Sequence, residues 1–370
     1  MSSLLTNEKL RNIAIIAHVD HGKTTLVDAM FRQSGLFRQG QQVDERVMDN
    51  MDLERERGIT IAAKNCSVVY QGVKINIVDT PGHADFGGEV ERALSMVDGA
   101  ILLVDASEGP LPQTRFVLQK ALQSKLKIIV VVNKVDRKDA RSSAVLDQVY
   151  DLLIDLDANE DQLEFPLFYA IGRDGVAGTV PDHLADDLHL LFDAIVKEIP
   201  PPQFDPESPF QMLVSDLGYS DYLGRLAVGR VVGGQAESRH QLIRIDAEGN
   251  HRPLKVTRLQ IYEGMDITPV STVSAGEIAI LSGIDEVTIG DTICTEDAPF
   301  VLPRITVDPP TVSMLFTIND GPLGGKEGRY VQSAKIRERL LKETLLNVAI
   351  QVETTGDRDS VVVKGRGEFQ

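Results

Sequence analysis

Apolar residues in the first half of the chain gather into short, nearly continuous runs. Runs of this kind are typical of parallel strands buried on both faces of a sheet. The predicted strands are Arg11–Ala17, Lys74–Val78, Ala100–Val104, Lys127–Val132 and Phe165–Ile171. Amphipathic segments with helical spacing lie between them, at Thr24–Gln33, Gly87–Met96, Gln113–Gln123, Ala144–Leu153 and Leu188–Glu198. This alternation predicts a doubly wound α/β domain with a mostly parallel sheet over residues 1–204.

The pattern changes after the proline run Pro200–Pro202, which predicts a stiff linker. Short alternating segments with glycine turns then predict a β-barrel domain over residues 205–302. The expected strands are Phe210–Asp216, Gly224–Val232, His240–Asp246, Leu254–Ile261, Ile278–Leu281 and Asp291–Cys294.

A third pattern covers residues 303–370. A strand at Val312–Asn319, a helix at Gln332–Thr344 and strands at Val348–Glu353 and Ser360–Lys364 predict the first part of a ferredoxin-like α+β domain. A second helix would be needed to cover such a sheet. We therefore expect the chain to be a C-terminally truncated part of a longer protein.

Composition narrows the function classes. The chain has 370 residues and a net charge of -17, which disfavours broad nucleic-acid binding. Acidic residues concentrate in 138–205, so any RNA-facing surface must be local. No apolar run is long enough to cross a membrane, and the N-terminus lacks the pattern of a signal peptide. Cys66 and Cys294 have no metal-binding spacing, so we expect buried thiols in a cytoplasmic protein.

The first motif follows the first predicted strand. Ala17–Thr24 (AHVDHGKT) obeys the phosphate-loop pattern GxxxxGK[ST] except that Ala17 replaces the first glycine. Backbone N–H groups of such a loop point at phosphates, Lys23 supplies a positive charge, and Thr24 offers a hydroxyl ligand to Mg²⁺. The predicted nucleotide-binding residues are His18, Val19, Asp20, His21, Gly22, Lys23, Thr24 and Thr25.

Two further motifs predict the catalytic part of the site. Asp79–His83 (DTPGH) follows the second strand, where Asp79 is expected to hold Mg²⁺ through water and Gly82 to offer its N–H to the γ-phosphate. His83 is the candidate that orients the attacking water. Arg57–Ile61 (RGITI) lies in a charged stretch, and its Thr60 is expected to close over Mg²⁺ in the triphosphate state.

A fourth motif predicts the choice of base. Asn133–Asp136 (NKVD) ends the fourth strand. Asp136 can accept hydrogen bonds from the guanine N1–H and amino group, which adenine does not offer there. Asn133 can tie its loop to the phosphate loop, and the aliphatic part of Lys134 can cover one face of the base.

In these four motifs the chain resembles the translational GTPases related to elongation factors Tu and G. Within that group it is most similar to the BipA/TypA family, at Ala84–Asp98, Pro112–Leu118 and Gly325–Gly328. The resemblance implies a GTPase whose hydrolysis is stimulated by the ribosome, with roles in large-subunit assembly and in stress and cold adaptation. It implies that Val19 and Ile59 flank His83, and that Asp20 helps to hold a monovalent cation.

The resemblance also has one departure. Relatives usually carry Ser-Ala after the fifth strand, where backbone N–H groups meet the guanine O6. This chain has Ile171-Gly172 there, so we expect modestly weaker nucleotide binding. The expected partners are a guanine nucleotide and the ribosome, with no membrane and a monomeric chain.

Two alternatives remain open at this stage. One is a GTP-dependent binding module in which hydrolysis is incidental. The other is an RNA assembly factor or chaperone that acts through the second and third domains. Its basic segment, Lys335–Lys342 (KIRERLLK), could equally be the solvated face of an amphipathic helix.

Overall fold

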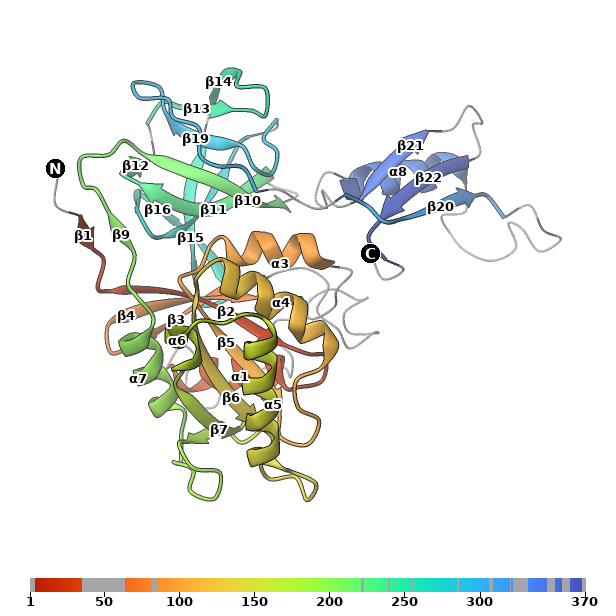
Figure 1. Ribbon diagram of the computed structural model, residues 1–370. Coiled ribbons are helices and arrows are strands. Elements are labelled where there is room, and N and C mark those ends of the chain that lie inside the picture. Colours follow the sequence, from red (N-terminus) through yellow and green to blue (C-terminus); the bar gives the residue numbers. More distant parts are fainter. Residues whose placement is uncertain are drawn as a thin grey trace.

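The computed structural model describes residues 4–34, 64–81, 86–220, 223–238, 240–254, 256–284, 286–305, 309–319, 321, 332–344, 350–354 and 360–367. An α/β domain, an antiparallel β domain and a small α+β region follow one another along the chain, as Figure 1 shows. The fold class predicted from the pattern is confirmed. No helix in the described ranges is long and apolar enough to span a membrane.

The first domain is built on a seven-stranded sheet with the order β3-β4-β2-β5-β6-β7-β8. The strands are β2 (Leu10–Ala17), β3 (Lys64–Tyr70), β4 (Val73–Asp79), β5 (Gly99–Asp105), β6 (Lys127–Asn133), β7 (Leu167–Ile171) and β8 (Val176–Gly178). The five central strands pair in parallel, and the edge strands β3 and β8 pair antiparallel. The carboxyl ends of the parallel strands therefore meet at one edge.

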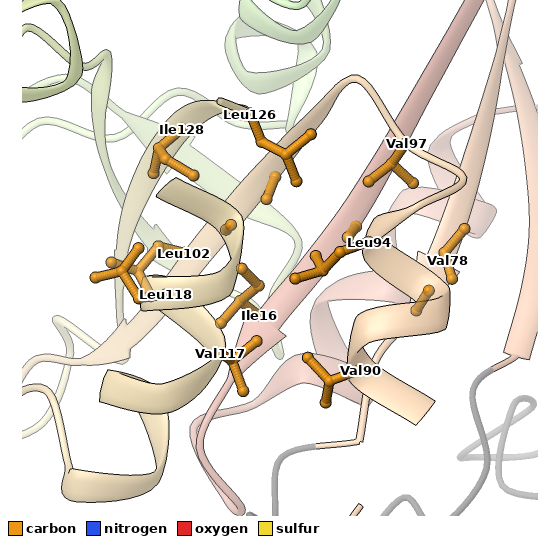
Figure 2. Close-up of a cluster of buried hydrophobic side chains, with 14 of the residues drawn as sticks. Ile16, Val78, Val90, Leu94, Val97, Leu102, Val117, Leu118, Leu126 and Ile128 are labelled. Carbon is orange, nitrogen blue, oxygen red and sulfur yellow. The ribbon is translucent and has the colours of Figure 1, made fainter. Parts of the chain in front are cut away.

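Helices cover both faces of this sheet. On one face α1 (Lys23–Gln33) and α7 (His189–Glu198) bury apolar side chains such as Met30 and Phe192. On the other face lie α3 (Gly87–Leu94), α4 (Pro112–Gln123) and α5 (Ser142–Asp155). Figure 2 shows Val90 and Leu94 of α3 beside Val117 of α4 over the strand residue Ile16. The short helix α6 (Glu160–Leu163) precedes β7.

The last predicted strand of this domain begins later than expected. Phe165–Ile171 was predicted as one strand, but β7 starts at Leu167. Pro166 has no N–H to donate to a ladder, although its carbonyl accepts a hydrogen bond of 2.9 Å from the Val130 N–H. The edge strands β3 and β8 were not predicted, although each pairs with its neighbour in sequence, β3 with β4 and β8 with β7.

The second domain is an eight-stranded antiparallel sheet with the order β14-β13-β19-β10-β11-β18-β15-β16, beside a β12-β17 pair. The strands are β10 (Gln211–Ser220), β11 (Gly224–Gly233), β12 (Gln235–Glu237), β13 (Leu242–Ile245), β14 (His251–Leu254), β15 (Arg258–Glu263), β16 (Asp266–Val270), β17 (Thr272–Ser274), β18 (Ile278–Ser282) and β19 (Thr292–Thr295). The predicted single strand Leu254–Ile261 is wrong. It contains the end of β14, which pairs with β13, and the start of β15, which pairs with β16 and β18.

The third region has a split βαβ arrangement. Strands β20 (Val312–Thr317) and β21 (Gln351–Thr354) flank β22 (Ser360–Gly365), which is antiparallel to both, and α8 (Ser333–Thr344) connects the first two. The order agrees with the first part of a ferredoxin-like domain. A short pairing of β1 (Leu5–Thr6) with β9 (Gln203–Phe204) ties the N-terminal segment to the linker.

Candidate nucleotide-binding site

The first candidate segment forms a tight loop between β2 and α1. Asp20 and Gly22 have positive φ angles of 64° and 93°. A Cβ atom on Gly22 would lie 2.4 Å from Asn133 Nδ2, so both the backbone angle and the close approach require glycine. In the described structure α1 has no side-chain cap at this end. Its first N–H groups and its positive dipole end therefore suit an anion at the loop.

Lys23 is the first residue of α1 and lies at the base of this loop. Its ammonium is 2.7 Å from Asp79 Oδ1 at the end of β4, and it also donates to the Thr80 carbonyl. Both Lys23 and Asp79 are buried. The Thr80 hydroxyl donates to the Ile15 carbonyl at 2.7 Å, which fixes the end of β4 against β2. The lysine and the aspartate of two distant motifs therefore share one location.

A pocket of about 260 Å³ opens beside the loop. Three segments line it, namely the start of α1, the loop after β6 and the loop after β7. The lining residues are Gly22, Thr25, Asn133, Lys134, Asp136, Arg137, Ile171, Gly172 and Arg173. Seven of these nine residues are ones for which the sequence predicts nucleotide contact. Arg137 and Arg173 were not predicted.

Asn133 holds the three segments together. Its side-chain amide donates to the His21 carbonyl at 2.9 Å, and its Oδ1 accepts from the Gly172 N–H at 2.9 Å. The N–H that the sequence assigns to the guanine O6 at Gly172 is thus bonded to Asn133 here. A Cβ on Gly172 would lie 3.3 Å from Asn133 Oδ1, so glycine leaves room for this amide.

Asp105, which lies in none of the four motifs, anchors Lys134. Its Oδ2 is 2.8 Å from Lys134 Nζ and 3.5 Å from Arg137, and its Oδ1 accepts from the Ser107 N–H and hydroxyl at 2.7 and 2.6 Å. Burial raises the pKa of this carboxyl, but the hydrogen bonds from Lys134 and Ser107 outweigh burial and hold it well below its ordinary value. An acidic residue at the end of the predicted strand Ala100–Val104 was the available signal.

Lys134 is therefore fixed from two sides. Its backbone has a positive φ of 62°, and its ammonium also lies 2.5 Å from the Asp20 carbonyl of the phosphate loop. Asp136 is exposed, with Oδ2 at 3.4 Å from the exposed Arg173 guanidinium. Both side chains of the predicted base-recognition motif thus have an ionic contact at the rim of the pocket.

The phosphate loop contains a buried histidine. His21 lies 3.5 Å from Glu108 through Nε2, and its ring packs edge-on against His18 at 5.3 Å between centroids. Burial and the neighbouring His18 lower the pKa of His21, which keeps its ring neutral at pH 7. Val19 is half-buried, whereas Asp20 and Thr25 are exposed.

Several predicted residues lie outside the described ranges. They are Ile59, Thr60, Gly82 and His83, so the predicted catalytic histidine and the switch threonine stay predictions. Thr24 is described and half-buried, next to Lys23. In the ranges that the structure covers, no group of three or more His, Cys, Asp or Glu side chains converges on one point.

Comparisons with known proteins agree with this geometry. The family described as the elongation factor Tu GTP binding domain matches residues 8–201. A protein from Escherichia coli strain K12 named "Large ribosomal subunit assembly factor BipA" is 51% identical over 362 residues, or 98% of this chain and 60% of its own length. The protein of the same name from Haemophilus influenzae is 50% identical over 370 residues, with 100% and 60% covered.

Fold similarity extends beyond these relatives. A crystal structure of a Thermus thermophilus protein has a TM-score of 0.71 at 18% identity, and the match covers 98% of this chain and 64% of that one. The chain spans about 60% of the length of the BipA proteins that it matches. The family match covers more than half of the chain and includes the whole pocket. The chain belongs to the family of the elongation factor Tu GTP-binding domain.

Proposed function

We propose that this chain binds GTP and GDP with Mg²⁺ and hydrolyses GTP to GDP and phosphate as a conformational switch. The observation that carries the proposal is the convergence of three segments on one pocket, whose lining residue Gly22 directly precedes Lys23 of the Lys23–Asp79 pair. Loops at the carboxyl edge of a parallel sheet form the usual ligand site of an open α/β fold. The membership in the GTP-binding family supports the same chemistry.

Base selection follows from the outer part of the pocket. Asp136 is the acceptor for the guanine N1–H and amino group, and a pocket built around this carboxylate rejects adenine because the acceptor would lose its partners. Asp105 and the Asp20 carbonyl hold the Lys134 ammonium, which supports the proposal that its aliphatic part covers the base. Ile171 and Gly172 close the far side.

Phosphate and metal binding follow from the inner part. The N–H groups at the start of α1 and the Lys23 ammonium bind the phosphates. Thr24 and Thr60 offer hydroxyl oxygens, the hard ligands that Mg²⁺ prefers, and the Asp79 carboxylate would hold Mg²⁺ through water. Bound Mg²⁺ would neutralise charge on the phosphate oxygens. A monovalent cation near Asp20 is a further part of the proposal.

His83 is the proposed catalytic residue. Its imidazole orients a water for attack on the γ-phosphorus, the bond to the β-phosphate oxygen breaks, and GDP and inorganic phosphate leave. Val19 and Ile59 flank the ring and keep it from other water. In this proposal the ribosome positions His83. GTP hydrolysis by the free protein should therefore be slow, because phosphoryl transfer depends on the alignment of the attacking water.

The proposed partner is the ribosome. The relatives are named as large ribosomal subunit assembly factors, and the chain matches them over nearly its whole length. We propose a cytoplasmic, monomeric factor that acts in translation or in assembly of the large subunit, under cold or other stress.

The alternative, an RNA-binding assembly factor or chaperone with incidental hydrolysis, depends on the basic side chains of α8. Lys335 lies 3.1 Å from Glu338, and Arg339 is paired with Glu343. Acidic residues of the same helix thus partly neutralise both basic residues. This favours the interpretation of α8 as an amphipathic helix with a solvated face over an RNA-binding role. Strong salt dependence of ribosome binding would instead favour contacts with phosphate.

The decisive experiment is GTP hydrolysis with and without ribosomes, on wild type and His83→Ala. Ribosomes should raise the wild-type rate, and His83→Ala should lower the stimulated rate by about 100-fold or more, the usual contribution of a positioned histidine. The matched control is His251→Ala, an exposed histidine on β14. If His83→Ala keeps the stimulated rate, the catalytic assignment is wrong. If the His83→Ala variant loses ribosome-stimulated hydrolysis but still supports assembly of the large ribosomal subunit, the result favours the alternative, an assembly factor in which hydrolysis is incidental.

A further inference from the structure

The loop that follows β5 contacts both the phosphate loop and the base-recognition motif, although it belongs to neither. The Ala106 N–H donates to the Asn133 carbonyl at 2.8 Å. The Asp105 N–H donates to His21 Nδ1 at 3.4 Å, and Glu108 lies 3.5 Å from the Nε2 atom of the same ring. One short loop is therefore bound to two of the segments that form the nucleotide pocket.

An arginine beside α5 fixes the backbone of this loop. Arg141 Nε donates to the Ser107 carbonyl at 2.8 Å, and Arg141 Nη2 donates to the Glu108 carbonyl at 3.1 Å. The Arg141 N–H donates to the Ala106 carbonyl at 2.8 Å. Three consecutive carbonyls of the loop thus accept hydrogen bonds from one residue. Side chains of this loop project from a fixed backbone.

The Asp105 carboxylate uses both of its oxygens. It is fully buried, Oδ1 accepts the two hydrogen bonds from Ser107, and Oδ2 lies 2.8 Å from the Lys134 ammonium. That ammonium also donates to the Asp20 carbonyl of the phosphate loop at 2.5 Å. The end of the long Lys134 side chain is therefore held from two directions. A free lysine side chain would lose conformational entropy when it is fixed against a ligand.

We propose that Asp105 is a positioning residue that lengthens the residence time of the bound guanine nucleotide by holding Lys134 over the base. The inference rests on the proposed function, because it needs a nucleotide in this pocket. A side chain that is already fixed pays a smaller entropy cost on binding, so the nucleotide is bound more tightly and released more slowly. Because Lys134 belongs to the base-recognition motif, GDP and GTP should be affected equally.

A double-mutant cycle separates this role from a general effect on the fold. Asp105→Asn has the same shape, and its amide oxygen can still accept from Ser107, but its NH₂ group then faces the Lys134 ammonium. Lys134→Met keeps an unbranched aliphatic side chain and removes the ammonium. Asp155→Asn is the matched control, because it removes a carboxylate of the same domain whose pair with Arg115 is exposed.

Nucleotide release is measured by displacement of fluorescent GDP and of a fluorescent, non-hydrolysable GTP analogue. Asp105→Asn should release both nucleotides about 10-fold faster than the wild type, within the range of couplings between side chains in contact. The double variant should release them within about twofold of Lys134→Met alone, since Asp105 acts through the ammonium. Asp155→Asn should release them at the wild-type rate.

The inference is overturned if Asp105→Asn releases nucleotide within about twofold of the wild type. It is also overturned if Asp105→Asn accelerates release as strongly in the Lys134→Met background as in the wild type. Thermal denaturation shows whether each variant is folded. Should Asp105→Asn not fold, Ser107→Ala decides, because it removes one hydrogen bond to the carboxylate. Release about threefold faster supports the inference, and release at the wild-type rate refutes it. The proposed function itself fails if the wild type binds neither nucleotide.

Discussion

The second and third domains are joined to the rest of the chain in very different ways. The second domain is joined by a polar network in which Glu277 binds Lys74 at 3.0 Å and Asn76 at 2.9 Å, and Asn12 donates to the Gly276 carbonyl at 2.9 Å. The Arg230–Asp98 pair at 2.7 Å extends this network. The third domain instead places cationic side chains over aromatic rings, Arg366 over Phe116 of the first domain and Lys342 over Tyr219 of the second domain.

The apolar core shows the same difference. Val228, Ile278 and Ile280 of the second domain belong to the core cluster that lies under α3 and α4 of the first domain. Burial of this kind requires fixed packing, because interiors are as dense as organic crystals. We infer that the first two domains move as one body. A contact of two cationic side chains, by comparison, suits a domain whose position changes between states.

The largest effect is expected from Glu277→Ala, which removes the centre of the polar network. Lys74 would keep its charge in a site where its side chain is only 18% exposed. Loss of one partner of a mostly buried pair should lower the free energy of unfolding by about 3 kcal/mol. Urea denaturation measures this. Glu286→Ala is the control, since it breaks the exposed pair with Arg252 and should cost less than about 1 kcal/mol. If Glu277→Ala and Glu286→Ala lower the free energy of unfolding equally, the polar network around Glu277 is not a buried, cooperative one.

Gly276→Ala tests the close approach at the same interface. Gly276 has a φ of +90°, and a Cβ there would lie 2.5 Å from Pro202 Cβ in the linker. Strain and overlap together should cost about 2 kcal/mol. Gly249 is the control, because its φ is +79° but a Cβ there would meet nothing within 4 Å. Thermal denaturation of Gly276→Ala and Gly249→Ala therefore separates the cost of backbone strain from the cost of steric overlap. If Gly276→Ala lowers the thermal stability no more than Gly249→Ala does, the linker at Pro202 moves aside at no cost in stability.

The pH dependence of stability tests the side of α3 that faces the second domain. Burial raises the pKa of Glu89 above its ordinary value of 4.5, and burial also raises the pKa of Asp216. The native state then takes up this proton at higher pH than the unfolded chain, so this contribution to the free energy of unfolding grows as pH falls toward 4.5 and is lost as pH rises through the folded pKa. Because Arg92 opposes the rise, the effect should be smaller than that of Gly276→Ala.

Urea denaturation of wild type and Glu89→Gln between pH 7 and pH 5 measures this dependence. The difference in free energy of unfolding between the two proteins should change with pH, since only the wild type takes up the proton. Glu91→Gln is a matched control on the same helix. Parallel curves for wild type and Glu89→Gln would contradict the assignment.

The smallest effect is expected from Lys342→Ala at the third domain. An exposed cation over an aromatic ring contributes about 0.5 kcal/mol. A double-mutant cycle with Tyr219→Leu, measured by calorimetry, isolates the pairwise coupling between the two side chains. A coupling as large as the Glu277 effect would remove the contrast between the two interfaces.

The local elements of the first domain could be predicted well. The parallel strands and the helices between them carry their own periodicity, so their residues differ from the structure mainly at the ends. The three-residue strands β8 and β12 were missed, because a strand this short has no clear apolar pattern and is defined by its partner. Asp105 was missed for a related reason, since its role depends on Lys134, which lies 29 positions away in the sequence.

The sequence by itself determined the order of the parallel strands and main helices of the first domain, the fold class and the identity of the four motifs, because periodicity and short motifs are local properties. Only the tertiary structure decided that Gly22 lies against Asn133, that Asp105 holds Lys134, and that Arg366 reaches Gly87. These contacts join residues far apart in the chain. The packing of whole elements sets their distances, and no local pattern records that packing.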